Sequence, residues 1–420
     1  MRKNRLIPFF VIGILIASLS SCTLGSGQGA SLEGDGDTIT LKYSKHLTLV
    51  KHADYVEAVI ANPWQENMEL HRYLLVPKGQ KGDEIVMELK KRRTGRHEDI
   101  IRTPLSDCVV YTSPHIQLMY ELGCDKALKG VCDLSYINIA DVKYRVSLKK
   151  NGIVDCGSSM QPSIERIIAL HPEALFISPF ENSGGYGKLD KLNIPIIETA
   201  DYMETSPLGR AEWMRFYGLL FGGEGQGEKK GTSGEIVLNP KADSLFCAIE
   251  KQYLSLKDSA SHLPLGRSIL TERKMGSVWY VPGGKSTTGI LLSDAHAQYV
   301  FADDNHSGSL ALSPEQILAK ATHIDVWAFK YLGTPAMPAL GENKSDRLLT
   351  RQDLLQEYKG YSLLKAFRDG EVYECNTNRV PFFEYTSFHP ERLLREYILL
   401  AHPKASIGGA NRLLFFSKMP

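Results

Sequence analysis

The sequence predicts an α/β protein with two Rossmann-like lobes joined by a long rigid α-helix, and with extra antiparallel β-strands before the first lobe. One observation is a repeat. SIERIIALHPEALFI begins at Ser163 and SPEQILAKATHIDVWAF begins at Ser313, and each places a glutamate third and ends in an apolar run. The two copies lie too far apart for a solenoid, whose period is roughly 20–50 residues. The other observation is that short apolar segments alternate with helical ones, which is typical of parallel sheets covered by helices.

The composition is that of an ordinary globular protein and is nearly neutral. The 420 residues include 49 basic and 48 acidic residues, for a net charge of +1. A nucleic-acid-binding protein normally has a basic excess or a basic stripe. The short run LKKRR at 89–93 does not amount to one. We therefore expect no nucleic-acid partner.

The N-terminus has the pattern of a secretory signal. Residues 1–21 contain a cationic start and an apolar core that is shorter than the roughly 20 residues of a membrane span. The tetrapeptide LSSC resembles the bacterial lipobox, which would make Cys22 the lipidated first residue of the mature protein. An ordinary signal peptide or an uncleaved anchor are the alternatives. Residues 22–37 are rich in Gly and Ser and are predicted to form a flexible tether.

Residues 38–105 are predicted to be antiparallel β-strands packed on the first lobe. The segments TITLKYS, LTLVKH, EAVIAN, RYLLVPKG and EIVMELK are separated by turn-forming residues. Residues 106–205 then alternate strands and helices and form the predicted N-terminal lobe. In its first helix, SPHIQLMYELG, Ser113 is the expected N-cap, Pro114 the first helical residue and Gly123 the left-handed stop.

Residues 206–262 are predicted to be the interlobe helical segment, and 263–420 the C-terminal α/β lobe. The helix in PKADSLFCAIEKQYLSLKD has Leu245, Ile249, Tyr253 and Leu256 at intervals of three to four residues. The strands RSILTE, VWYV, IDVWAF and EVYECN follow, with helices between and after them. Two lobes joined by a helix leave a cleft, and small ligands bind in clefts between α/β domains.

Several residues are candidates for a binding site. His115 follows a strand at a helix start, together with Ser113, and could bind a metal or an anion, although a lone histidine is more often structural. Aromatic residues beside loops could stack on a flat ligand. The residues predicted to contact the ligand are Ser113, His115, Tyr136, Tyr186, Trp279, Tyr280, Ser286 and Phe383. The twelve histidines form no closely spaced set, so we predict no dedicated metal site.

Glu165 and Glu315 have two interpretations. A carboxylate in a first helical turn complements the helix dipole, which contributes roughly 0.3–1 kcal/mol. Alternatively, an exposed carboxylate on each lobe could pair with arginines of one partner that spans both lobes. The six cysteines after Cys22 also leave two possibilities open, namely a disulfide, with Cys124 and Cys132 the best pair, or buried free thiols.

Four segments in this order resemble the helical-backbone (class III) periplasmic binding lipoproteins. They are TSPHIQLMYELG, CGSSMQPSIERIIALHPEALFI, LSPEQILAKATHIDVWAF and FHPERLLREYILLAHP, and the resemblance spans residues 106–403. Members of this family are receptors of ABC importers for ferric siderophores, haem and cobalamin. The N-terminal strands and the segment ETSPLGRAEW look like variants found in Bacteroidetes-type lipoproteins.

The resemblance implies a function without covalent chemistry. The chain would capture an iron complex, haem or a corrinoid in the interlobe cleft, as a lipid-anchored monomer of the cell envelope that faces the periplasm. Glu165 and Glu315 match the family positions that dock onto arginines of the permease dimer. No resident cofactor is expected. The alternatives are a metal-chelatase-like enzyme that uses His115 with Glu181, and a zinc or manganese receptor. Lys285 and Lys330, like Glu181, could pair with a charged chelate.

Overall fold

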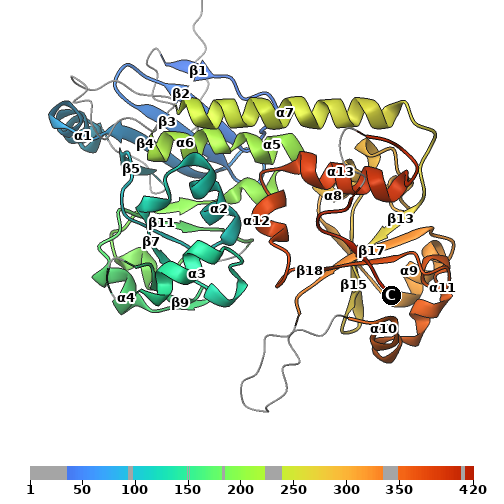
Figure 1. Cartoon of the computed structure of the whole chain (residues 1–420). Helices are drawn as coiled ribbons and strands as arrows, with labels where there is room; N and C mark the ends of the chain where they lie inside the picture. The colour runs from blue at the N-terminus through green and yellow to red at the C-terminus, as the bar shows by residue number, and fades with distance from the viewer. Residues whose placement is uncertain are drawn as a thin grey trace, which may run out of the picture. The chain divides into compact units, whose positions relative to one another are not determined.

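The computed structural model of the chain describes residues 36–92, 98–148, 150, 152–181, 185–222, 239–333, 349–407 and 412–420. The signal, Cys22 and most of the tether lie outside these residues. Two parallel sheets follow one another along the chain (Figure 1). This confirms the predicted α/β class with two lobes.

The sheet of the first lobe has the strand order β12-β11-β6-β7-β8, and all its strands are parallel. Its strands are β6 (Cys108–Val110), β7 (Leu128–Val131), β8 (Val154–Asp155), β11 (Ala174–Ile177) and β12 (Ile196–Glu198). Helices α2 (Ser113–Leu122), α3 (Ala140–Ser147) and α4 (Ile164–Ala169) connect them, with the small hairpin β9 (Gly157–Ser158) and β10 (Gln161–Pro162). The short turn η4 (Ala200–Met203) ends this lobe.

The second lobe contains two sheets. The larger has the order β13-β17-β18-β19, in which β19 alone is antiparallel to its neighbour, and the smaller is the antiparallel sheet β14-β15-β16. The strands are β13 (Ile269–Thr271), β14 (Lys274–Met275), β15 (Val278–Pro282), β16 (Ser309–Leu312), β17 (Val326–Tyr331), β18 (Val372–Asn376) and β19 (Ser417–Lys418). The helices are α8 (Thr287–Asp294), α9 (Pro314–Ala321), α10 (Arg351–Glu357), α11 (Lys365–Arg368), α12 (Phe382–Thr386) and α13 (Pro390–Ala401).

The repeated segment occupies the same place in both lobes. In the first copy α4 leads into β11, which lies between β6 and β12, the first and last parallel strands of its lobe. In the second copy α9 leads into β17, which lies between β13 and β18 in the same way. The sequence repeat is therefore a repeat of topology.

The N-terminal segment differs in part from its prediction. Strands β1 (Asp37–Ile39), β2 (Leu47–Lys51), β3 (Val56–Ala61) and β4 (Glu69–Pro77) are antiparallel neighbours as expected. However, EIVMELK lies in helix α1 (Gln80–Arg92), and β5 (Glu98–Thr103) pairs with β4 in parallel. A parallel pair needs a crossover connection, and the spacing of Ile85, Val86 and Leu89 lets α1 pack on Leu74 and Val76 of β4. We call residues 36–105 the N-terminal module.

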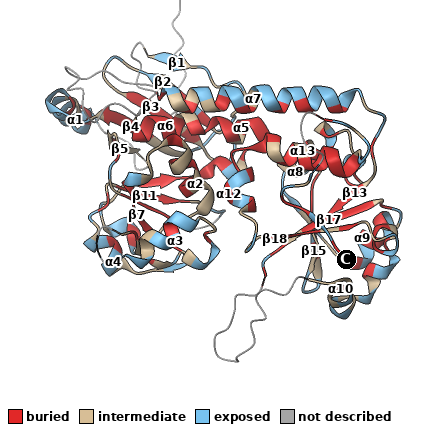
Figure 2. Ribbon diagram, in the orientation of Figure 1, coloured by how far each residue is buried: buried red, intermediate tan, exposed pale blue. Residues whose placement is uncertain are grey.

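The interlobe segment consists of three helices, α5 (Pro207–Glu212), α6 (Met214–Phe221) and the 22-residue α7 (Pro240–Ser261). At 1.5 Å per residue α7 is about 33 Å long. Its buried residues, among them Phe246, Ile249, Tyr253 and Leu256, recur every three to four positions, and the opposite face is exposed (Figure 2). Its buried face contacts α6 on one side and α13 on the other (Figure 1).

A second connection joins the lobes. Helix α12 belongs to the C-terminal part of the chain but packs against α2 of the first lobe. The backbone N–H of Asn138 donates to Glu384 of α12 at 2.9 Å. The chain therefore returns to the first lobe before α13 packs along α7 and α8. In the ranges given above, no helix combines the length and the apolar character that crossing a membrane requires.

Candidate functional site

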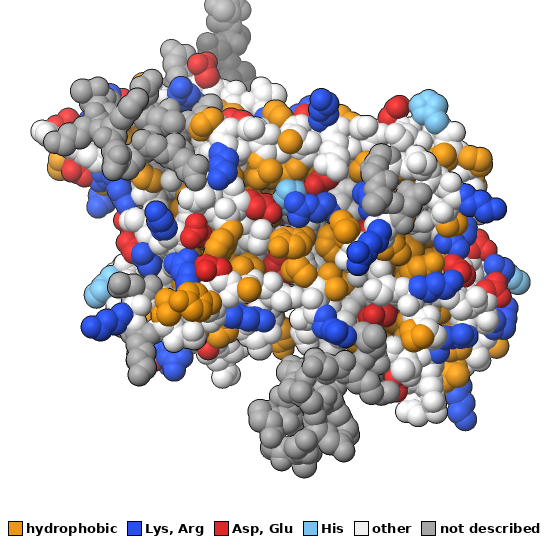
Figure 3. All heavy atoms as spheres, viewed as in Figure 1, with side chains coloured by type: hydrophobic (Ala, Val, Ile, Leu, Met, Phe, Trp, Pro, Cys, Tyr) orange, Lys and Arg blue, Asp and Glu red, His pale blue; other side chains and the backbone are white. Residues whose placement is uncertain are grey.

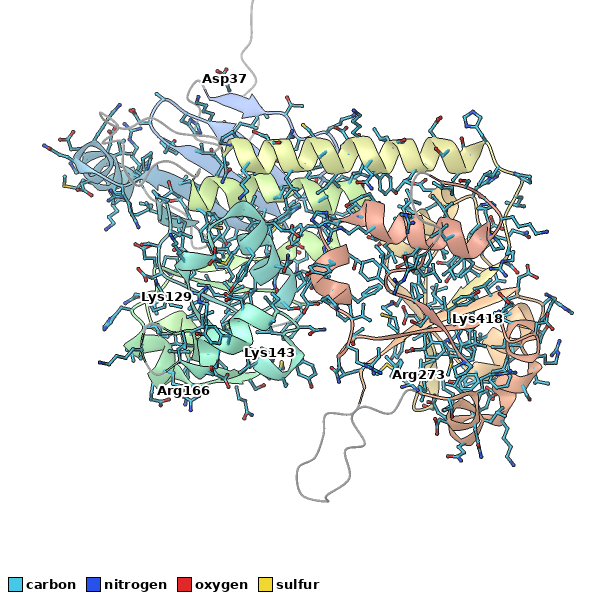
Figure 4. All side chains as sticks on the ribbon, in the orientation of Figure 1. Asp37, Lys129, Lys143, Arg166, Arg273 and Lys418 are labelled. Atoms are coloured by element: carbon cyan, nitrogen blue, oxygen red, sulfur yellow. The ribbon has the colours of Figure 1, made fainter. Side chains whose placement is uncertain are left out.

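A pocket of about 480 Å³ has walls from both lobes. This volume lies within the range of small-molecule sites, about 300–1,000 Å³. The first lobe contributes the end of η4 and the next residue, and the second lobe contributes the rest. The lining residues are Tyr202, Met203, Glu204, Glu272, Arg273, Met275, Tyr280, Pro282, Ser286, Thr287, Thr288, Ser307, Gly308 and Ser309. Figure 4 labels Arg273 on the second lobe.

The start of helix α8 forms one wall of the pocket. The hydroxyl of Ser286 caps the helix by accepting from the N–H of Gly289 at 3.1 Å, and it donates to the carbonyl of Gly283 at 2.7 Å. A Cβ at Gly289 would lie 2.4 Å from the Gly283 oxygen. The loop can fold this tightly onto its helix only because position 289 is glycine.

A hydrogen bond between the two lobes joins two lining residues of the pocket. The Thr287 hydroxyl donates to the backbone carbonyl of Glu204 at 3.0 Å. Glu204 follows η4 of the first lobe, whereas Thr287 is the first residue of α8. The pocket wall is thus continuous from one lobe to the other at this point.

The Glu204 segment is held from behind by the N-terminal module. The Glu204 carboxylate is buried and accepts the backbone N–H groups of Lys45 and His46 at 2.9–3.1 Å, and the indole N–H of Trp213 at 3.0 Å. Glu212, in α5, accepts the N–H groups of Lys42, Tyr43 and Ser44 at 2.8–2.9 Å. Carboxylates that accept several N–H groups are strongly stabilised. The module therefore fixes the position of the pocket's first-lobe wall.

Glu272 and Arg273 lie at the carboxyl end of β13. Glu272 has a left-handed backbone, with φ of 63°, which is uncommon for a residue with a side chain and costs energy. Its carboxylate pairs with Lys330, and Arg273 pairs with Glu357. Such strained positions cluster at binding sites, and this one lies in the pocket wall.

His115 does not face the pocket, and its expected place in a ligand site was wrong. It is buried, and its Nε2 lies 2.7 Å from Asp201 Oδ1, while its Nδ1 contacts the Thr112 hydroxyl. Tyr217 and Arg210 bind the same carboxylate at 2.9 and 3.0 Å. Burial would raise the pKa of Asp201, but His115 and Arg210 outweigh it and lower that pKa. Both ring nitrogens are engaged, so His115 holds α2 to η4.

Two of the predicted ligand contacts, Tyr280 and Ser286, line the pocket. Trp279 was wrongly expected to stack on a ligand, because alternation along β15 places it fully in the core beside Trp327 while Tyr280 points outward. Ser113 and Tyr186 are half-buried and do not line the pocket. The Tyr186 hydroxyl donates to Glu198 at 2.7 Å, and burial raises its pKa. Ser113 is also not the N-cap of α2, since Thr112 occupies that position.

Tyr136 and Phe383 are exposed but do not line this pocket. Phe383 belongs to α12, and apolar side chains gather over the middle of the face drawn in Figure 3, in the region where α12 lies in Figure 1.

Sequence reasoning missed Met203, Arg273, Met275, Thr288 and the segment 307–309. Their residue types are common in loops and no local pattern marks them. In the sequence, nothing distinguishes Tyr202 from the many other aromatic residues beside loops.

The two repeated glutamates are exposed in the first turns of α4 and α9. Ser313 and Gln316 form a capping box around Glu315. Hydrogen bonds from its own backbone N–H and from Ser163 lower the pKa of Glu165, so it is ionised at neutral pH. The docking role of both residues remains a prediction.

The described cysteines after Cys22, at positions 108, 124, 132, 156, 247 and 375, are free thiols. Cys124 and Cys132 are not bridged. Within the described ranges, no group of three or more His, Cys, Asp or Glu residues is arranged to hold a metal ion.

Comparison with known proteins gives one family match. The family model described as "Periplasmic binding protein" matches residues 109–378, which include every residue that lines the pocket. The N-terminal module lies outside the matched region.

Relatives and solved structures agree with this match. An uncharacterized lipoprotein of Methanocaldococcus jannaschii is 24% identical over 385 residues, which cover 88% of this chain and 84% of the relative. A second uncharacterized lipoprotein of that organism is 20% identical over the whole of both chains. A periplasmic heme-binding protein from Pseudomonas aeruginosa has a TM-score of 0.51 at 16% identity, covering 75% of this chain and 99% of that one. An ABC-type Fe3+-hydroxamate transport protein from Saccharomonospora viridis has a TM-score of 0.50 at 17% identity, covering 70% and 92%. These two structures share the fold.

Proposed function

The chain belongs to the periplasmic binding protein family, and on that premise we propose that it is the lipid-anchored receptor of an ABC importer for an iron complex, haem or a corrinoid. The observation that carries the proposal is the pocket of about 480 Å³ whose walls come from both lobes inside the matched region. A ligand that touches both lobes is recognised only when they are correctly placed. The names of two structures with the same fold, a periplasmic heme-binding protein and an ABC-type Fe3+-hydroxamate transport system, support this class of ligand.

The proposed partners follow from the same premise. Glu165 and Glu315 would meet arginines on the two subunits of a permease dimer, because each lobe presents one exposed carboxylate from an equivalent helix. Such pairs steer and orient an encounter more than they add affinity. Cys22 would carry the lipid that tethers the receptor to a membrane facing the periplasm, which the lipoprotein names of two relatives support. Assignment to a Bacteroidetes-type lipoprotein remains a prediction.

Two experiments test the receptor function. The first is purification of the protein from native cells, followed by absorbance and mass spectrometry of the bound small molecule. An iron complex, haem or a corrinoid at a stoichiometry near one is expected.

The second experiment compares Tyr280→Ala with Tyr144→Ala. Tyr280 lines the pocket, whereas Tyr144 is a more exposed tyrosine on α3 that does not. Loss of the Tyr280 ring should weaken binding of the co-purified molecule about tenfold, because a stacked aromatic contributes on the order of 1 kcal/mol beyond its buried area. Equal effects of the two variants would place the ligand elsewhere and refute capture in this pocket.

A further inference from the structure

The charged groups that line the pocket already have partners inside the protein. They are Glu204, Glu272 and Arg273. The Glu204 carboxylate accepts hydrogen bonds from N–H groups of the N-terminal module and from the Trp213 indole. Glu272 pairs with Lys330, and Arg273 pairs with Glu357. Each charged group of the wall is therefore already engaged within the protein.

Two cations close to the lining, Lys330 and Arg210, are paired as well. Lys330 lies 5.5 Å from the ring centre of Phe382, in addition to its contact with Glu272. Arg210 is bound to the buried carboxylate of Asp201, next to Tyr202, at 3.0 Å. A charged ligand that recruited one of these groups would first have to break its pair, which costs several kcal/mol.

The neutral groups of the pocket differ between its two sides. On the second lobe the hydroxyl groups of Tyr280, Thr288, Ser307 and Ser309 make no hydrogen bond with the described part of the protein. On the first lobe the Tyr202 hydroxyl donates a hydrogen bond to the Pro179 carbonyl. The first-lobe wall therefore consists of the Tyr202 ring together with Met203. Met275 and Pro282 add apolar surface on the second lobe. The free hydroxyl groups of the lining thus lie on the second lobe, whereas apolar surface comes from both lobes.

From this arrangement we infer that the ligand is a metal chelate with little or no net charge, with an apolar face for the first lobe and peripheral oxygen or nitrogen atoms for the hydroxyl groups of the second. This inference rests on the proposed receptor function and narrows its ligand class. Hydroxyl groups both donate and accept, so they suit a neutral ligand of mixed polarity. Polyanionic chelates are disfavoured, because the one lining cation, Arg273, is already occupied.

The test uses four probes that differ in charge. Ferrichrome is a ferric trihydroxamate whose three singly charged groups cancel the charge of Fe³⁺, and cyanocobalamin is uncharged overall. Haem carries two propionates, and ferric enterobactin is a tricatecholate with a net charge of minus three. Dissociation constants are measured by fluorescence quenching of the full mature chain at low and high salt. We expect one of the two uncharged probes to bind tightest, with a dissociation constant that changes less than about threefold with salt, because screening acts on charge–charge attraction.

One variant and its control sharpen the test. Thr288→Val removes a hydroxyl group at nearly constant shape and should weaken binding about threefold to tenfold, the net worth of one neutral hydrogen bond. Thr48→Val, at an exposed position of the N-terminal module, is the matched control and should have no effect.

The outcomes separate the inference from the function on which it rests. Tightest binding by haem or by ferric enterobactin would overturn the inference and leave the receptor function standing. Binding of none of the four probes would overturn the receptor function itself, and the inference with it.

Discussion

At the scale of single residues, buried charged side chains join parts of the chain that are distant in sequence. His389, just before α13, lies 2.8 Å from Glu121 of α2 and 2.9 Å from Glu391 of α13. Both partners are carboxylates, so the protonated imidazole, in which both ring nitrogens donate, is the form that these contacts favour. His389 thus bridges the C-terminal helices and the first lobe.

The first prediction concerns pH. Burial alone would lower the pKa of His389, but the hydrogen bonds to Glu121 and Glu391 outweigh it and raise that pKa above the ordinary 6.5. A histidine whose pKa is higher in the folded state than in the unfolded state stabilises the folded protein. This stabilisation is fully present below the pKa of the unfolded state, and it is lost as the pH rises through the pKa of the folded state. Gln117 at 3.2 Å from Glu121 and Arg392 at 3.6 Å from Glu391 complete the surroundings. The free energy of unfolding should therefore fall as the pH rises above about 6.5.

Urea unfolding of His389→Gln checks this prediction. The variant should lose about 3 kcal/mol or more at pH 6, where it leaves two carboxylates without their cation, and it should lose less at pH 9. His262→Gln is the control, because that side chain is 75% exposed. A loss that is the same at both pH values would contradict a role for the His389 charge.

At the scale of elements, close packing of loops and helices sets the shape of the pocket. The loop between β15 and α8 folds back so that Gly289 faces the carbonyls of Gly283 and Gly284 at distances that exclude a Cβ. The same loop presents Ser286, Thr287 and Thr288 to the pocket. The glycine is thus part of the pocket's construction although it does not line it.

The second prediction is that Gly289→Ala destabilises the protein. Alanine is favoured over glycine within a helix by about 1 kcal/mol, but a Cβ at 2.4 Å from the Gly283 oxygen forces the loop to move, which costs typically 1–3 kcal/mol. Thermal unfolding should show a lower Tm, and ligand affinity should fall. Gly308→Ala, where the new Cβ meets no atom within 4 Å, should leave the Tm unchanged.

The third prediction concerns the attachment of the N-terminal module. Glu212→Ala leaves the N–H groups of Lys42, Tyr43 and Ser44 without their acceptor, and it should cost about 3 kcal/mol or more. The control is Glu84→Ala, at an exposed position of α1. Limited proteolysis should cleave the module faster in the first variant. Unchanged stability would mean that the carboxylate does not fasten the module.

At the scale of the whole molecule, the repeat places one exposed carboxylate on an equivalent helix of each lobe. The lobes are joined by α7 and also by α12, which packs on α2. Because these connections do not involve Glu165 or Glu315, ligand capture and docking should be separable.

The fourth prediction tests this separation. The double variant Glu165→Ala/Glu315→Ala should bind its ligand as tightly as the original protein, and uptake by cells that carry the importer should fall to background. The matched control replaces Glu66 and Glu84, two exposed glutamates of the N-terminal module. Normal uptake by the Glu165/Glu315 variant would remove the docking role, and weakened ligand binding would show that the two roles are not separate.

The sequence by itself determined the lobes and most of their elements, because the signals are local. Glycine at 123 ends α2 with φ of 74°, Ser206 caps α5, and apolar spacing marks α7. These features depend on neighbours within a few residues, so a single sequence is enough to find them.

Tertiary structure alone decided which side chains meet. Sequence reasoning had placed His115 and Trp279 at the ligand, yet one is bound to Asp201, 86 residues away, and the other is buried against Trp327. Sequence reasoning had also suggested that Lys330 could pair with a charged ligand, whereas in the folded chain Lys330 pairs with Glu272. Burial and pairing depend on contacts between distant segments, which local periodicity does not encode. For the same reason, it became visible only in the folded chain that each charged group of the pocket lining is already engaged within the protein.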